Sequence, residues 1–127
     1  MLEDRFAQHD KVIVDKFNDV GEDYQMKTYD YVMRPSADGT SGAITITLPP
    51  VAEAKGRLYS IICRNADAVN TVTIQDKDDS ECWPGDITMN GKCDAVLLYS
   101  DGLAWLTITS SLSYTGTTPA PVSTEQT

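Results

Sequence analysis

The sequence predicts an all-β protein, a single small antiparallel β-sandwich or barrel of jelly-roll type. Three observations lead to this prediction. Several segments alternate apolar and polar residues with the period of two that a half-buried strand requires. These segments recur about every 8–12 residues, and turn-forming residues separate them. The chain has 127 residues, a length that suits one domain with one core.

We expect three regions along the chain. Residues 1–27 form an N-terminal arm or docking segment, residues 28–109 form the β-domain, and residues 110–127 form a flexible Ser/Thr/Pro-rich tail. Two interpretations of the arm stay open, since its apolar residues could line a helix face and KVIV is also a plausible short strand. The arm packs either on its own domain or on another subunit. The candidate residues for partner contact are Phe6, Val12, Ile13, Phe17 and, in the tail, Tyr114.

The first half of the β-domain contains two expected strands. TYDYVM at 28–33 alternates aromatic and polar residues, and RPSADG after it is expected to be a turn. AITITL at 43–48 alternates strictly, so its Ile and Leu side chains face one way and its Thr side chains the other. Pro49-Pro50 ends this strand because neither proline can donate to a ladder. VAEAKG at 51–56 could make one helical turn that Gly56 closes.

The second half predicts further strands and two hairpins. RLYSIICR at 57–64 does not alternate cleanly, which favours a strand covered on both faces. TVTIQ at 71–75 alternates again, with Val72 and Ile74 inward. ITMNGK contains a short strand and an Asn-Gly turn, a strong hairpin signal. CDAVLLYSDGLAWLTI at 93–108 predicts a second hairpin around Ser-Asp-Gly.

The charge of the chain excludes some classes of partner. Nineteen acidic and ten basic residues give a net charge of −9. The cations are scattered singly, whereas nucleic-acid phosphates and anionic membranes require clustered Lys and Arg. The polar N-terminus lacks the apolar region of a secretory signal, and no apolar run is long enough to cross a bilayer. We therefore expect a protein made in a cytoplasm that binds neither nucleic acid nor membrane.

Residues that could carry catalysis or hold a metal are few. His9 is the one histidine and lies in the arm, where it has no evident partners for a hydrolytic triad. Cys63, Cys82 and Cys93 lack the spacing of a zinc site. Cys63 is expected in the core, and a Cys82–Cys93 bridge is conceivable although a reducing compartment favours free thiols. We predict no enzyme, no cofactor and no metal.

The acidic loop DKDDSECWPGD at 76–86 is the candidate recognition loop. Its start resembles a calcium loop, but an EF-hand requires Gly and Glu where this chain has Glu81 and Ile87. Two interpretations remain, a different cation site or a solvated acidic turn. Trp83 and Trp105, with Tyr99, could instead stack on a sugar, although aromatic residues on hairpins more often pack in a core. The residues assigned to the exposed loop are Asp76, Asp78, Asp79 and Trp83.

The order of several motifs resembles a β-module of tailed-phage virion proteins, which occurs in head decoration proteins, head fibres and tail fibres. The matching segments are TLPP at 47–50, AKGR at 54–57, NTVTI at 70–74 and the hairpin from Val96 to Trp105. The resemblance covers about residues 40–109. One departure is DSECWPGD, which replaces the usual Gly-rich segment before the short strand, so a function of that loop would be particular to this chain.

The resemblance implies a non-catalytic structural virion part that is a homotrimer. The first hypothesis is a capsid decoration or cement protein on the capsid surface, whose partner is the major capsid protein. The alternative is a head- or tail-fibre or spike component that binds a host receptor or surface glycan, although little chain precedes the β-module to form a shaft. A carbohydrate-binding module is a third class, and a small hydrolase a fourth. The expected trimer interface contains Tyr29, Tyr31 and Trp105.

Overall fold

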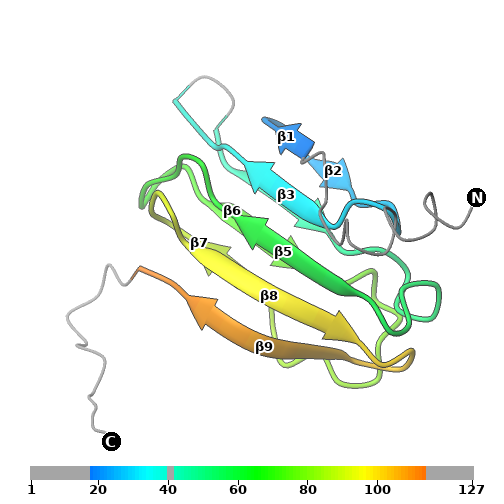
Figure 1. Cartoon of the computed structure of the whole chain (residues 1–127). Helices are drawn as coiled ribbons and strands as arrows, with labels where there is room; N and C mark the ends of the chain where they lie inside the picture. The colour runs from blue at the N-terminus through cyan, green and yellow to red at the C-terminus, as the bar shows by residue number, and fades with distance from the viewer. Residues whose placement is uncertain (1–17, 40–41, 114–127) are drawn as a thin grey trace, which may run out of the picture.

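The structure, a computed structural model, describes residues 18–39 and 42–113 (Figure 1). The predicted all-β class is confirmed, because this part of the chain consists of strands, turns and loops. It accordingly holds no helix that could span a bilayer. The strands are β1 (Asn18–Val20), β2 (Tyr24–Gln25), β3 (Val32–Pro35), β4 (Ile44–Thr47), β5 (Leu58–Ile62), β6 (Val72–Gln75), β7 (Ile87–Met89), β8 (Ala95–Ser100) and β9 (Trp105–Ser111).

The strands form two sheets that the chain visits alternately. One sheet has the order β1-β3-β5-β8-β9, and the other has the order β2-β4-β6-β7. From β1 to β6 each strand lies in the sheet opposite to the strand before it, so the chain coils three times between the sheets (Figure 1). As a result, β1, β3 and β5 run parallel as neighbours, and so do β2, β4 and β6.

The expected antiparallel arrangement is wrong, because both sheets are mixed. The pairs β5–β8, β8–β9 and β6–β7 are antiparallel, whereas the coils contribute parallel pairs. The described strands also form two separate sheets and no closed barrel, and the antiparallel connectivity of a jelly roll is not present. Alternation along a strand determines which residues face inward, but it contains no information on the direction of the neighbouring strand.

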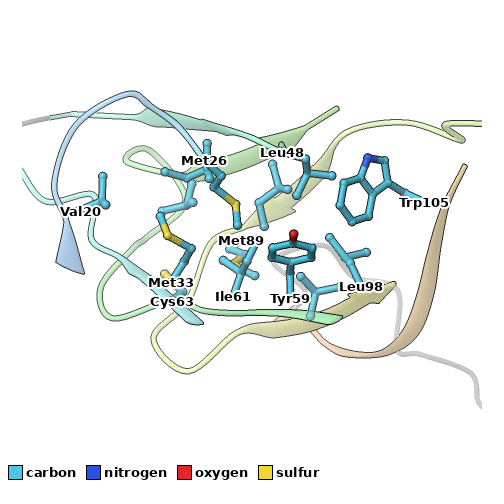
Figure 2. Close-up of a cluster of buried hydrophobic side chains, with 14 of the residues drawn as sticks. Val20, Met26, Met33, Leu48, Tyr59, Ile61, Cys63, Met89, Leu98 and Trp105 are labelled. Carbon is cyan, nitrogen blue, oxygen red and sulfur yellow. The ribbon is translucent and has the colours of Figure 1, made fainter. Parts of the chain in front are cut away.

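One hydrophobic core lies between the two sheets (Figure 2). The Tyr59 hydroxyl donates to the Thr28 carbonyl oxygen at 2.8 Å, and burial raises the pKa of Tyr59 to about 12. Its ring stacks on Tyr31 at a centroid distance of 5.5 Å and meets Trp105 edge-on at 5.6 Å. Each large apolar side chain buried here stabilises the fold by about 1.5–3 kcal/mol. The other large buried side chains include Met26, Met33, Ile46, Leu48, Ile61, Ile74, Met89 and Leu98.

The strictly alternating segments form strands as predicted. Ile44, Ile46 and Leu48 are buried along and just after β4, and Val72 and Ile74 are buried in β6. The double proline ends β4, and the chain then makes a hydrogen-bonded turn. One bond of α-helical spacing forms there, from the Ala54 N–H to the Pro50 carbonyl oxygen at 3.0 Å. Gly56 has a φ of +79°, so it supplies the left-handed residue expected at the end of this turn.

The hairpin of β8 and β9 is also confirmed. Ser100 lies opposite Trp105, and the Asp101 N–H donates to the Ala104 carbonyl oxygen at 3.2 Å. The Asp101 carboxylate accepts the N–H groups of Leu103 and Ala104, both at 2.8 Å, which is the local bonding that makes Asp favourable in turns. These two bonds lower the pKa of Asp101. The turn chemistry of Ser-Asp-Gly therefore operates as the sequence predicts.

The strand predicted at 28–33 is displaced, because β3 begins at Val32 and includes Pro35. The Asp30 carboxylate accepts the Lys27 N–H at 2.8 Å and the Tyr24 hydroxyl at 2.7 Å, and these bonds hold residues 27–30 in a turn. Pro35 was expected in a turn but ends the strand. It is tolerated there because its carbonyl oxygen accepts the Arg64 N–H at 2.8 Å and no donor is required of it.

The hairpin predicted at Asn90-Gly91 is wrong. β7 pairs with β6 in one sheet, and the turn after it carries the chain across to β8 in the other sheet. The buried Asp94 holds this crossing in place. Its carboxylate accepts the Asn90 N–H at 3.1 Å, the Ser113 N–H at 2.9 Å and the Ser113 hydroxyl at 2.6 Å. One side chain thus connects the start of β8 with the end of the described chain.

Strands lie on both sides of the predicted boundaries at residues 28 and 109. β1 and β2 lie before residue 28, where the β-domain was expected to begin, and they pair with β3 and β4. Leu112 lies after residue 109 and packs against the core. The predicted contact residues of the arm and tail lie outside the described residues, and so does His9. Those contact residues are Phe6, Val12, Ile13, Phe17 and Tyr114.

Candidate interaction surface

The outer face of β5, β8 and β9 is an uncharged surface built from three cross-strand rows. Because side chains alternate between the two faces of a sheet, the residues that flank the buried ones point outward. The pairing register then aligns them across the three strands. We call the resulting set the uncharged face. It comprises Leu58, Tyr99 and Leu106 in the first row, Ser60, Leu97 and Thr109 in the second, and Ile62, Ala95 and Ser111 in the third.

Exposed apolar side chains are concentrated on this face. Leu58 is 49% exposed, Ile62 40%, Leu106 44% and Ile108 54%. The first three belong to the uncharged face and Ile108 lies beside them at the bulge in β9, and these are four of the seven large hydrophobic residues that are exposed in the described chain. A shallow, open hollow of about 280 Å³ crosses the same face, with lining residues from all three strands. Such clustering differs from the scattered apolar residues of an ordinary protein exterior.

The same sheet becomes charged beyond β5. On β1 and β3, Asp19 and Arg34 form an ion pair with N–O distance 2.9 Å, and Arg64 approaches Asp19 at 3.7 Å. The outward positions of β5, β8 and β9 hold apolar or hydroxyl side chains and no charged one. The sheet exterior is therefore divided into a solvated, ion-paired part and a part suited to contact with another uncharged surface.

The sequence contains one signal for this face, in the segment that forms β5. The segment 57–64 does not alternate cleanly, which led to the prediction that both faces of its strand are covered. In the structure Tyr59 and Ile61 are buried in the core, while Leu58 and Ile62 point outward and are not covered by the described chain. The apolar character of both faces was thus detectable, but the outward residues could not be identified without the register.

The residues expected at the trimer interface are not brought together on one surface. Trp105 is only 3% exposed and lies in the core, so its ring is not available to another chain. Tyr31 is partly buried between Tyr59 and Arg57, and the Arg57 guanidinium donates to its hydroxyl. Tyr29 is 69% exposed in the turn before β3. An interface centred on these three residues does not fit this arrangement.

The acidic loop is held by hydrogen bonds within the loop and to the turn after β4. The Asp76 carboxylate accepts the Ser80 hydroxyl at 2.7 Å, and the Asp79 carboxylate accepts the Val51 N–H at 3.2 Å. Asp78 has a φ of +63°. Within residues 18–39 and 42–113, no three His, Cys, Asp or Glu side chains gather as they would around a metal ion. The carboxylates of Asp76 and Asp79 therefore accept from protein donors, one within the loop and one in the turn after β4.

The aromatic residues proposed for sugar stacking do not form one platform. Trp83 packs against the edge of the core, and its indole N–H donates to the Asp86 carboxylate at 3.0 Å. Trp105 is buried in the core, whereas Tyr99 lies on the opposite, outer face of the same sheet. No flat surface of these three rings is therefore available to a sugar.

The three cysteines are free thiols, so the conceivable Cys82–Cys93 bridge is not formed. Cys63 is buried as predicted, and burial raises its pKa to about 11. Because reactivity requires an accessible thiolate, we expect Cys82 and Cys93 to react rapidly with a thiol reagent and Cys63 to react only after unfolding. Counting fast-reacting thiols in the native and denatured chain checks this. Protection of Cys82 and Cys93 in the native chain, lifted by a reducing agent, would contradict it.

No family model, curated protein or solved structure matches this chain.

Proposed function

We propose that this protein is a capsid decoration or cement protein, a structural virion component that binds the outer surface of a tailed-phage head as a homotrimer and stabilises it. In this proposal the two packed sheets are a β-sandwich module that acts by binding and carries no catalytic site or cofactor. The protein is made in the host cytoplasm, and its partner is the major capsid protein. The resemblance of residues 40–109 to virion β-modules is the basis of the proposal.

The observation that supports it most is the place of the resembling motifs in the fold. TLPP lies at the end of β4, AKGR leads from the turn into β5, and NTVTI leads into and includes most of β6. The hairpin from Val96 to Trp105 spans β8, its turn and the start of β9. Each motif thus coincides with a strand end or turn that shapes the module, which is expected if the pattern encodes a fold and not a reactive site.

A second support is the kind of surface that the module offers. Its uncharged face presents apolar and hydroxyl side chains over three strands, and this composition suits contact with protein. Three copies held together would present three sets of contacts to a shell, and such multivalency converts weak single contacts into stable attachment. Cement proteins require durable attachment of this kind.

The test is the copy number of this chain in purified virions, relative to the major shell protein, by quantitative mass spectrometry. Hundreds of copies per particle are expected, because a decoration protein occupies repeated positions of the shell. A handful to a few dozen copies would instead favour the fibre or spike alternative at a tail or vertex. Absence from the particle would contradict both roles and favour the carbohydrate-binding module.

A further inference from the structure

We propose that the uncharged face of β5, β8 and β9 is the surface through which copies of this chain contact one another. The inference deepens the proposed function by naming the contact surface of the homotrimer. Only the expectation that three copies assemble rests on the proposed function. It replaces the interface expected at Tyr29, Tyr31 and Trp105. Four observations carry it, namely the charge of the chain, the composition of the face, the open edge of β9 and the position of the other exposed apolar residues.

The charge of the chain restricts where two copies can meet. Each chain carries a net charge of −9, so most of its surface repels a second copy. The uncharged face is an extended exception, because its nine positions span three strands without an acidic or basic side chain. Around a threefold axis the same residues of the three copies converge, so charged residues there would bring like charges together, whereas uncharged residues do not. A second copy therefore fits this face better than it fits the charged part of the same sheet.

The composition of the face gives such contact a favourable free energy. Leu58 and Leu106 flank Tyr99 in one row, and Ile62 lies in the third row. Covering these side chains removes apolar area from water, which favours association by about 25 cal/mol per Å² before the cost of ordering. The hydroxyl groups of the middle and third rows can donate to a partner without bringing a charge into the contact.

The free edge of β9 continues this surface. β9 is the last strand of its sheet and pairs only with β8 among the described strands, and every residue from Leu106 to Ser111 is exposed. Natural proteins protect such edges with charged residues, prolines or bulges. Residues 102–113 contain no charged residue and no proline. Of these three kinds of protection, the edge has only the bulge opposite Leu97 and Leu98. Contact with another copy would cover the face and the edge together.

The remaining exposed apolar residues do not offer a competing surface. Val69 is 81% exposed in the loop between β5 and β6, Leu103 is 59% exposed in the β8–β9 turn, and Tyr29 lies in the turn before β3. Each is a single residue in a different turn or loop, and scattered residues of this kind are ordinary on protein surfaces. They serve instead as positions for control substitutions.

The experiment is to place a cation on the face and measure self-association of the full chain. We choose Leu106→Lys on β9 and Ile62→Lys on β5, with Val69→Lys as the matched control. Each substitution changes the net charge of the chain equally and towards neutrality, so general repulsion cannot explain a difference among them. Sedimentation velocity across a dilution series gives the association constant, and thermal unfolding confirms that each variant is folded.

The expected result is a trimer for the unsubstituted chain and for Val69→Lys, with association weakened at least about tenfold in Leu106→Lys and Ile62→Lys. If both face variants associate like the control, or if the unsubstituted chain stays single at all concentrations, the inference is overturned. A dimer that the face variants dissociate would support the uncharged face as the contact surface and contradict the trimeric state. Failure of the capsid role appears separately, as absence from the virion in the copy-number measurement.

Discussion

Replacing Trp105 by alanine is expected to lower the free energy of unfolding by about 3–5 kcal/mol, the largest loss that we predict for a single substitution. The indole is 3% exposed and packs edge-on against the central Tyr59, so its removal leaves a cavity between the sheets (Figure 2). A domain of this size is stabilised by only about 5–15 kcal/mol in total. Chemical denaturation monitored by circular dichroism measures the difference.

Two further variants make this prediction specific. Trp105→Phe retains most of the apolar volume and removes an indole N–H that has no hydrogen-bond partner among the described residues, so its cost should be about 1–2 kcal/mol. Trp83→Ala changes the other tryptophan, which is only partly buried, and should cost less than Trp105→Ala. Equal stability of Trp105→Ala and the unsubstituted chain would contradict the core position of Trp105.

Replacing Asp94 by alanine is the second substitution with a large expected effect, a loss of about 3 kcal/mol. The carboxylate is 3% exposed and accepts two backbone N–H groups and one hydroxyl. Without it, the N–H groups of the half-buried Asn90 and of Ser113 lose the charged acceptor that joins them. The crossing from β7 to β8 and the end of β9 should loosen together, which hydrogen exchange at these amides would detect.

The matched control for Asp94 is Ser113→Ala. It removes only the hydroxyl donor and keeps the backbone N–H bond, so the expected cost is about 1 kcal/mol. Gly91→Ala is an independent check of the contact between Asp94 and Ser113. A Cβ at residue 91 would approach the Ser113 hydroxyl to 2.5 Å, so this variant should also be less stable than the unsubstituted chain. The role assigned to Asp94 would be refuted if Asp94→Ala were no more harmful than Ser113→Ala and left exchange at these amides unchanged.

Much of the fold was predictable where local chemistry decides the outcome. The strict alternation of residues 43–48 and 71–75 identified the buried side chains of β4 and β6, because a half-buried strand leaves few other arrangements. Ser-Asp-Gly identified the β8–β9 turn, where Asp101 makes the expected local bonds. Cys63 was recognised as a core residue by its place in a strand.

The errors arise where contacts outside the segment itself decide. The turn at 27–30 depends on Asp30 meeting Tyr24, a contact that alternation in TYDYVM does not reveal. Asn-Gly is a good turn signal, but the sheet to which the next strand belongs depends on Asp94 and on pairing with β5. The candidate surface was missed for the same reason, since Leu58 and Leu106 become neighbours of Tyr99 only through the register of three strands.

The coiling of the chain between its two sheets has a consequence for the order of folding. The parallel pairs join strands that are far apart along the chain, and closing such long loops costs entropy before any contact compensates for it. The β8–β9 hairpin needs only the short turn after Ser100. We therefore expect β8 and β9 to make the first stable contacts. The parallel pairs, which contain the strands nearer the N-terminus, should form after them.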